Sequence, residues 1–440
     1  MQSWSGRLNG YSAYIYDVTQ PIRAAVVNNM SSVVPSGDRE LKTMARRYNM
    51  MIIDVTLDYW NADRSAQRVL DTLAAGANAF PDRPEIRYLN VVLMGFSAGS
   101  AGAAITASSP LLSNPDPTKA PQRVIAVATY HELDPPPYLP PAWTPHLFIS
   151  DPGDVYGGLL TNVEGYVPAT GHDAFARQLA AAGRPITVFS QYGEWHGGSY
   201  YGWWHYASAR FLRFWTEAIL AASLPAAPST TGPVMAPDWR TYSGAWRASY
   251  DVAQNTGVQP WGSKERMVNV VTAPKDSLTG PRPYIWLPTQ AVANYWQTAV
   301  NTGSLPAEYP SAATALTSFV RPGSDAAGRD YVDSPVWTTT DGSLPVPSTG
   351  ASCAFSPSGD GNLIINYDRG VVSASAVATG AVVSKAPWVW GSTLVVPLKR
   401  TVSSPTLNVA LTNIVMADGN TAPNLNVAAK YLVQCPASSS

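Results

Sequence analysis

The chain is poor in charged residues. Asp, Glu, Lys and Arg make up 13% of its 440 residues and the net charge is -1, whereas about a quarter of a typical soluble domain is charged. No basic stripe is present, which argues against a nucleic-acid partner. No apolar run reaches the roughly 18 residues of a membrane-spanning helix, so we expect no membrane span. Few charges beside 15 tryptophans indicate contact with neutral sugars or other uncharged polymers.

Motifs for metals and cofactors are also missing. The sequence holds no HExxH motif, no Cys/His ligand spacing and no phosphate-binding loop, so we expect neither a metal nor a cofactor. Glu132 and Asp134 are a pair of carboxylates of the kind that glycosidases use. Their spacing of two residues after a strand gives little support to that chemistry.

Only two cysteines occur, Cys353 and Cys435, and they bracket the last segment of the chain. Such a pair predicts a disulfide and hence a secreted or periplasmic protein. The alternative is two unrelated buried thiols. The opening residues, MQSWSGRLNGYS, lack the basic start and apolar core of a signal peptide. Composition and the cysteine pair still favour export.

The chain length favours two to three domains. Over residues 1–224, short apolar strands alternate with amphipathic helices, which predicts an α/β domain with a mostly parallel sheet covered on both faces. Residues 225–308 begin with a Pro-rich linker and either complete that domain or bridge to the next. Residues 309–440 hold short strands and turn signals without helical periodicity, which predicts a β-sandwich.

The first domain contains GFSAG, residues 95–99, directly between an apolar strand and a helix of small residues. This is the pattern of a nucleophile elbow, in which a sharp strained turn exposes the serine and two glycines let strand and helix approach. Ser97 is therefore the candidate nucleophile, and the N–H of Ala98 is a candidate oxyanion donor. The alternative is a strand end that simply needed flexible residues.

A nucleophilic serine needs a base, and the base needs an orienting carboxylate, in the chain order Ser, acid, His. Asp154 follows the strand HLFIS and is the preferred acid, with Asp151 as the alternative. His196 follows the last strand in a Gly-rich loop, and it is the only one of five histidines that fits the order. Asn29 or Met30, after the strand RAAVVNNM, is the expected second oxyanion donor through its backbone N–H.

Aromatic residues cluster in the loops near these candidates and are expected to line a substrate cleft, although several could pack under the closing helix instead. The expected substrate contacts are Tyr138, Trp143, Tyr192, Trp195 and Tyr200. No Arg or Lys cluster lies near the triad, so a neutral ester is favoured.

These motifs, GFSAGSAGA, PHLFISDPGD and GEWHGG, make residues 11–222 resemble an α/β-hydrolase of the polyhydroxybutyrate depolymerase and feruloyl esterase kind. The oxyanion loop departs from that pattern, because many relatives have His-Gly where this chain has VVNNMSS. The segment with LTNIVMADGNTA resembles bacterial immunoglobulin-like modules.

The resemblance implies a serine esterase acting through an acyl-enzyme on acetyl or feruloyl esters of polysaccharides. Two alternatives stay open. One is a polyester depolymerase whose β-sandwich adsorbs to the polymer, and the other is a non-catalytic binding protein on a hydrolase scaffold. The oligomeric state is not predicted by the sequence.

Overall fold

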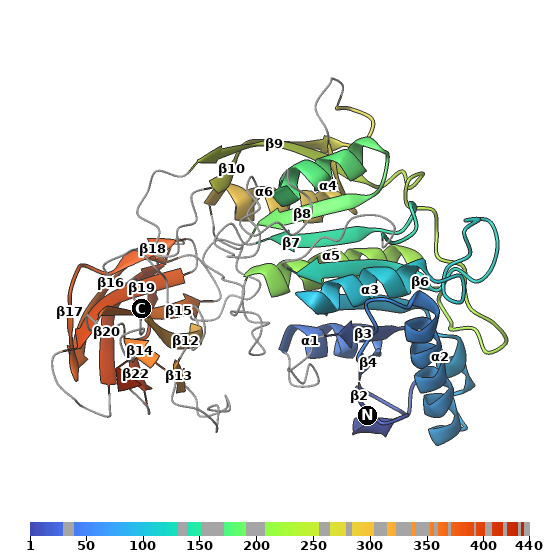
Figure 1. Cartoon of the computed structure of the whole chain (residues 1–440), viewed down its shortest axis with the longest axis horizontal. Helices are drawn as coiled ribbons and strands as arrows, with labels where there is room; N and C mark the ends of the chain where they lie inside the picture. The colour runs from blue at the N-terminus through green and yellow to red at the C-terminus, as the bar shows by residue number, and fades with distance from the viewer. Residues whose placement is uncertain are drawn as a thin grey trace. The chain divides into compact units, whose positions relative to one another are not determined.

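The chain folds into two compact units, which are essentially residues 1–300 and 301–440 (Figure 1). The computed structural model describes residues 1–29, 39–130, 139–150, 171–190, 207–254, 265–278, 284–302, 315–322, 336–339, 353–355, 360–367, 371–390, 393–400, 407–416, 420–429 and 433–434. In these ranges no helix combines the length and the apolar character needed to cross a bilayer.

An eight-stranded sheet organises the first unit, in the order β1-β2-β4-β3-β5-β6-β7-β8. Its first two strands run antiparallel to their neighbours, and β3 to β8 all run parallel. The central parallel strands are buried on both faces, which explains their continuous apolar sequences. The strands are β1 (Trp4–Leu8), β2 (Tyr11–Ile15), β3 (Ala25–Asn29), β4 (Met51–Asp54), β5 (Val91–Phe96), β6 (Val124–Tyr130), β7 (His146–Ser150) and β8 (Ile186–Ser190).

Helices cover both faces of this sheet. They are α1 (Arg39–Tyr48), α2 (Ala62–Ala79), α3 (Ala98–Ser108), α4 (Gly171–Ala181) and α5 (Ala207–Ser223). Gly95 faces α3, and Val188 of β8 lies in register with it across the sheet and therefore on the same face. Trp215 of α5 donates its Nε1–H to the hydroxyl of Thr187, the residue before Val188, at 2.9 Å. Because neighbouring residues of a strand face opposite ways, α3 and α5 lie on opposite faces.

Strand order, parallel run and two-faced helix cover together make this an α/β-hydrolase fold, as the sequence predicts. The C-terminal ends of β3 to β8 share one edge of the sheet, where ligands bind in open α/β sheets. The helix of small residues expected directly after GFSAG is present as α3.

The described residues between 224 and 300 belong to the same unit, and some of them contact its outer strand β8. They form β9 (Trp246–Gln254), β10 (Glu265–Pro274) and β11 (Ile285–Leu287), in the order β10-β9-β11, followed by α6 (Gln290–Thr302). Trp296 donates its Nε1–H to the carbonyl of Val188 at 2.7 Å, and Thr187 donates its hydroxyl to the carbonyl of Trp286 at 2.5 Å. The long β9–β10 hairpin was not predicted from the sequence, although apolar and polar residues alternate over residues 246–252 of β9. Residues of β10 show no such alternation.

From residue 315 onward, the described residues of the second unit form β-strands and short connections. Ten strands form one antiparallel array in the order β16-β20-β22-β13-β12-β15-β19-β17, with β18 on β19 and β21 on β20. Its core draws on both halves of the array, for example Leu363 and Leu394 against Leu407 and Val409, which is the packing of a sandwich. The strands are β12 (Ala315–Pro322), β13 (Val336–Thr339), β14 (Cys353–Phe355), β15 (Asp360–Tyr367), β16 (Val371–Thr379), β17 (Ala381–Val383), β18 (Trp388–Trp390), β19 (Thr393–Arg400), β20 (Leu407–Met416), β21 (Thr421–Ala422), β22 (Leu425–Ala429) and β23 (Val433–Gln434).

Candidate active site

The backbone at Ser97 is strained. Ser97 lies between β5 and α3 with φ 51° and ψ -132°, a conformation that non-glycine residues rarely adopt. Such a residue costs about 1–3 kcal/mol and persists only where its surroundings impose it. Ser97 is half-buried, and its side chain does not cap α3 although it occupies the N-cap position. The strain is what the elbow motif predicts, and a merely flexible strand end would not need it.

Two glycines make the elbow sterically possible. A Cβ atom on Gly95 would lie 2.1 Å from the carbonyl oxygen of Gly99. One on Gly99 would lie 1.9 Å from the carbonyl oxygen of Asn29. Real Cβ atoms do not approach backbone atoms so closely, so neither position admits a side chain. The glycines on either side of Ser97 are therefore explained by close packing of β5, α3 and β3.

Hydrogen bonds to the neighbouring strand β6 hold the elbow in place. The carbonyl of Tyr130, at the end of β6, accepts from the N–H of Ser97 at 3.0 Å and from the hydroxyl of Ser100 at 2.9 Å. The N–H of Tyr130 donates back to the Ser100 hydroxyl at 3.0 Å. Ser100 is 1% exposed, so its hydroxyl is structural. The second serine of GFSAGS thus fixes the first against β6.

The start of α3 supplies the chemistry of an oxyanion site. The first N–H groups of a helix have no partner within the helix, and the helix dipole favours negative charge there. Ala98 is the first residue of α3 and directly follows Ser97. Its N–H is therefore one of these first helical N–H groups, at the residue directly after Ser97.

Several predicted site residues lie outside the described residues. Asp154 comes four residues after the end of β7, and His196 comes six residues after the end of β8. Both strands are parallel to β5, so each ends at the edge where Ser97 lies. The other residues outside the described ranges are Met30, Tyr138, Asp151, Tyr192, Trp195 and Tyr200.

Asn29, by contrast, is described, and it lies inside β3 as its last residue. The sequence suggested its backbone N–H as an oxyanion donor. The structure adds a buried side chain that donates to the carbonyl of Gly99 at 3.0 Å and accepts from the N–H of Leu57 at 3.1 Å. No periodicity or motif signals this contact.

A buried carboxyl group near the same edge was also missed from sequence. Asp54 ends β4 and pairs in register with Asn28, on the face opposite α3. Its Oδ1 and both amide atoms of Asn28 are buried and have no hydrogen-bond partner among the described residues. Burial raises the pKa of Asp54 to about 7, and the nearby Asn28 amide opposes this shift only in part.

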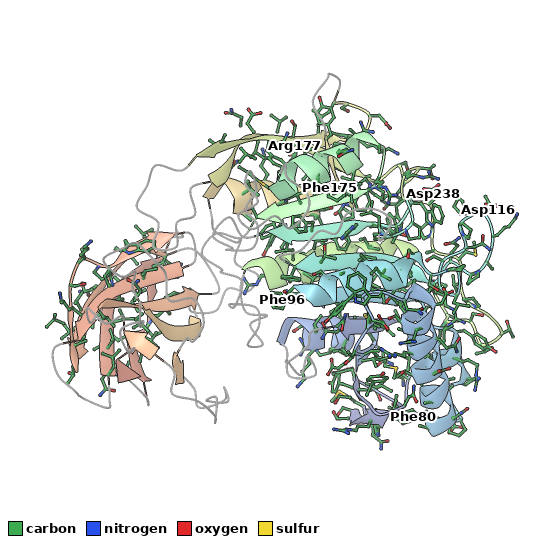
Figure 2. The ribbon with its side chains drawn as sticks, in the orientation of Figure 1. Phe80, Phe96, Asp116, Phe175, Arg177 and Asp238 are labelled. Carbon is green, nitrogen blue, oxygen red and sulfur yellow. The ribbon has the colours of Figure 1, made fainter. Side chains whose placement is uncertain are left out.

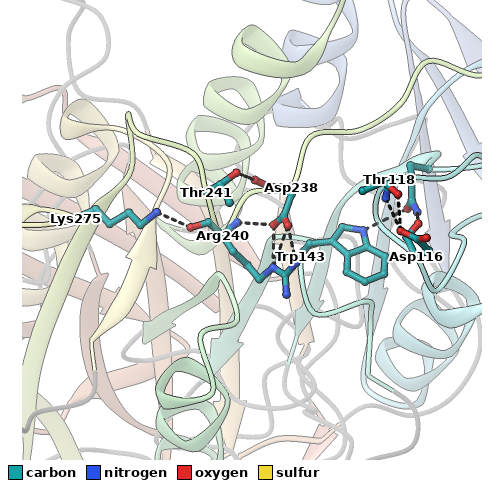
Figure 3. Close-up of polar contacts among 8 residues, drawn as sticks. Asp116, Thr118, Trp143, Asp238, Arg240, Thr241 and Lys275 are labelled. Carbon is teal, nitrogen blue, oxygen red and sulfur yellow. Dashed lines mark hydrogen bonds and ion pairs between the residues drawn. The ribbon is translucent and has the colours of Figure 1, made fainter.

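Trp143 does not lie with Ser97. It precedes β7 at the opposite edge of the sheet, is 8% exposed, and donates its Nε1–H to the Gln122 side chain at 3.3 Å. Figure 3 shows it beside Arg240, whose guanidinium lies 5.9 Å from the ring and pairs with Asp238. In Figure 2, Phe96, which is next to Ser97, and Asp238 are labelled at opposite ends of the strands. At this edge Trp143 is a buried packing residue, and its expected contact with substrate stays a prediction.

His146 cannot serve as the base for Ser97. It begins β7, away from Ser97, and its Nε2 lies 2.8 Å from the hydroxyl of Thr129. Burial is the main cause that lowers the pKa of His146 to about 3, with Arg184 as a second cause. It is therefore neutral in the folded protein, and His172 in α4 is the only other histidine in the described residues.

This buried histidine makes the fold sensitive to acid. The pKa of His146 is lower in the folded chain than its ordinary 6.5, so the unfolded chain gains the proton first and stability falls as pH drops below about 6.5. Between pH 7 and pH 5 the loss is about 2 kcal/mol, at 1.36 kcal/mol per pH unit. We expect His146→Gln to lack this part of the pH dependence. Urea unfolding of both proteins at pH 7 and pH 5 checks it, and equal losses would contradict it.

No group of three or more His, Cys, Asp or Glu side chains within the described ranges is arranged to hold a metal ion.

No protein-family model and no curated protein matches the chain. Solved structures that resemble it include an esterase from Pyrobaculum calidifontis, with 14% identity, 50% of this chain and 84% of that chain covered, and a TM-score of 0.32. A dienelactone hydrolase from Anabaena variabilis has 14% identity, coverage of 51% and 99%, and a TM-score of 0.31. An epoxide hydrolase from Vigna radiata has 9% identity, coverage of 50% and 98%, and a TM-score of 0.30. The fold assignment rests on the strand order and not on these similarities.

Proposed function

We propose that the chain is a serine hydrolase that cleaves neutral carboxylic esters through an acyl-enzyme. The observation that carries the proposal is the strained Ser97 at the β5–α3 junction, beside the N-terminus of α3. A serine with strained backbone angles, between two glycines that have no room for a side chain, matches the requirements of a nucleophile elbow.

The proposed reaction assigns each group one task. His196 takes the proton from the Ser97 hydroxyl while the oxygen attacks the ester carbonyl, and Asp154 holds His196 in the required tautomer. The N–H of Ala98 donates to the resulting oxyanion. His196 then returns the proton to the leaving alcohol. Water, activated by His196, cleaves the acyl-enzyme and restores Ser97.

We propose acetyl or feruloyl esters of polysaccharides as the substrates. The low charge and high tryptophan content of the chain favour an uncharged polymeric substrate. A panel of p-nitrophenyl esters from acetate to octanoate, with a feruloyl ester, tests this directly. Fast turnover of acetate or ferulate supports the proposal, preference for medium chains supports a polyester substrate, and no turnover of any ester contradicts esterase function.

Covalent trapping gives the panel a second readout. An activated phosphonate ester should transfer its phosphonyl group to the Ser97 oxygen and release its leaving group as the alcohol. Mass spectrometry of the peptide around Ser97 detects this adduct. Labelling elsewhere, or none, would contradict the assignment of Ser97 as nucleophile.

We also propose that Cys353 and Cys435 form a disulfide in a secreted protein. Support comes from the parallel pairing of β14 with β23, which sets Cys353 opposite Val433. Cys435 follows β23 directly and lies outside the described residues. Mass measurement of the non-reduced chain, with and without thiol alkylation, tests the bond.

A further inference from the structure

The side chain of Asn29 is connected to Ser97 through a single peptide unit. Its Nδ2 donates to the carbonyl oxygen of Gly99 at 3.0 Å. The N–H of the same peptide unit belongs to Ser100 and donates to the carbonyl oxygen of Ser97 at 2.7 Å. One planar group therefore carries both hydrogen bonds. Any rotation of that plane changes the hydrogen bond that holds Ser97 at its unusual ψ angle.

The same carboxamide also binds the segment that follows β4. Its Oδ1 accepts from the backbone N–H of Leu57, which follows β4. Asn29 is 4% exposed, so both of its hydrogen bonds are shielded from water. The exits of β3, β4 and β5 are thus joined at one side chain.

The small residues after Ser97 make room for this side chain. A Cβ atom on Gly102 would lie 2.4 Å from the Nδ2 of Asn29. The carbonyl oxygen of Asn29 similarly excludes a side chain at Gly99, as described above. The small residues of α3 therefore leave room for Asn29 as well as for close packing on the sheet.

We propose that the Asn29 carboxamide is a positioning residue for catalysis at Ser97. It orients the Gly99–Ser100 peptide unit, and through it the Ser97 carbonyl and the Ala98 N–H that frames the oxyanion. It touches neither substrate nor reacting atoms. The inference rests on the proposed function, because positioning is measured through ester cleavage.

Asn29→Asp tests the hydrogen bond to Gly99 with nearly no change in shape. The ionised carboxylate accepts from Leu57 but has no proton to donate to Gly99, whereas the protonated acid can do both. We expect kcat for a p-nitrophenyl ester to fall about tenfold to a hundredfold at pH 8, as small misplacements of reacting groups cause, with KM changed far less. The ratio of variant to wild-type kcat should rise as pH is lowered.

Asn90→Asp is the matched control. Asn90 is also buried, at 5% exposure, and donates to the carbonyl of Val234 at 2.8 Å, but it precedes β5 at the opposite edge of the sheet. We expect it to lower the melting temperature and to leave kcat and its pH profile unchanged. Gly102→Ala, which pushes on the Asn29 amide without altering it, should lower kcat in the same way and serves where Asn29→Asp fails to fold.

The outcomes separate the two proposals. Activity that persists in Ser97→Ala overturns the function, whatever Asn29 does. If Ser97 is essential but Asn29→Asp and Gly102→Ala keep wild-type kcat, or Asn29→Asp shows a ratio that is flat with pH, Asn29 is structural only and the positioning role is overturned.

Discussion

Ser97→Ala should lose ester cleavage by about 10⁴-fold or more in kcat/KM while the chain still folds. The hydroxyl is the proposed nucleophile, and Ala keeps the Cβ and thus the local packing of the elbow. Circular dichroism and urea unfolding show whether the variant is folded, and initial rates on p-nitrophenyl acetate give its activity. Wild-type turnover in a folded Ser97→Ala protein would rule out the proposed mechanism.

Ser97→Gly extends the same test to the strain at this position. Glycine adopts positive φ without penalty, so it should relieve part of the cost of φ 51°. We expect Ser97→Gly to be as inactive as Ser97→Ala but more stable than it by about 1 kcal/mol. Equal stability of the two inactive variants would mean that the turn at Ser97 stores no strain.

The elements of the α/β unit could be predicted because their signals are local. The strand of residues 91–96 is a continuous apolar run, and α2 carries an apolar stripe with Asn61 as its N-cap. The elbow could be predicted because its two glycines and its serine are adjacent in sequence. Each of these features needs only a few neighbouring residues to be recognised.

What the sequence did not predict depends on contacts between distant residues. Asn29 and Gly99 are 70 positions apart, so their hydrogen bond leaves no trace in either local pattern. Trp143 was grouped with the aromatic residues expected to line the substrate cleft. Its place at the other edge follows from its position before β7 and from Gln122, 21 residues away. The β9–β10 hairpin was missed although β9 alternates, because β10 lacks that pattern and its pairing with β9 is irregular between Val268 and Val271.

Asp54→Asn should stabilise the protein at neutral and alkaline pH. Burial raises the pKa of Asp54 from its usual 3.8 to about 7. Between these two pH values the folded chain keeps a proton on Asp54 that the unfolded chain has lost. Folding stability therefore falls as pH rises from about 4 to about 7 and stays low above it. Asn is isosteric and cannot ionise. Its advantage should be near zero at pH 4 and reach at most about 4 kcal/mol at pH 8, at 1.36 kcal/mol per unit of pKa shift.

Asp238→Asn is the control with the opposite sign. Hydrogen bonds from Arg240 lower the pKa of Asp238, so its carboxylate stabilises the folded chain above its usual pKa and this contribution is lost in acid. Urea unfolding of both variants at pH 4, 6 and 8 should therefore give a gain that grows with pH for Asp54→Asn and a nearly constant loss for Asp238→Asn, because the contribution of Asp238 disappears only below about pH 4. A constant difference between Asp54→Asn and wild type across this range would contradict the assignment. A gain at pH 8 would mean that the chain keeps a destabilising acid two strands from Ser97, as expected where an edge of the sheet is shaped for activity at the expense of stability.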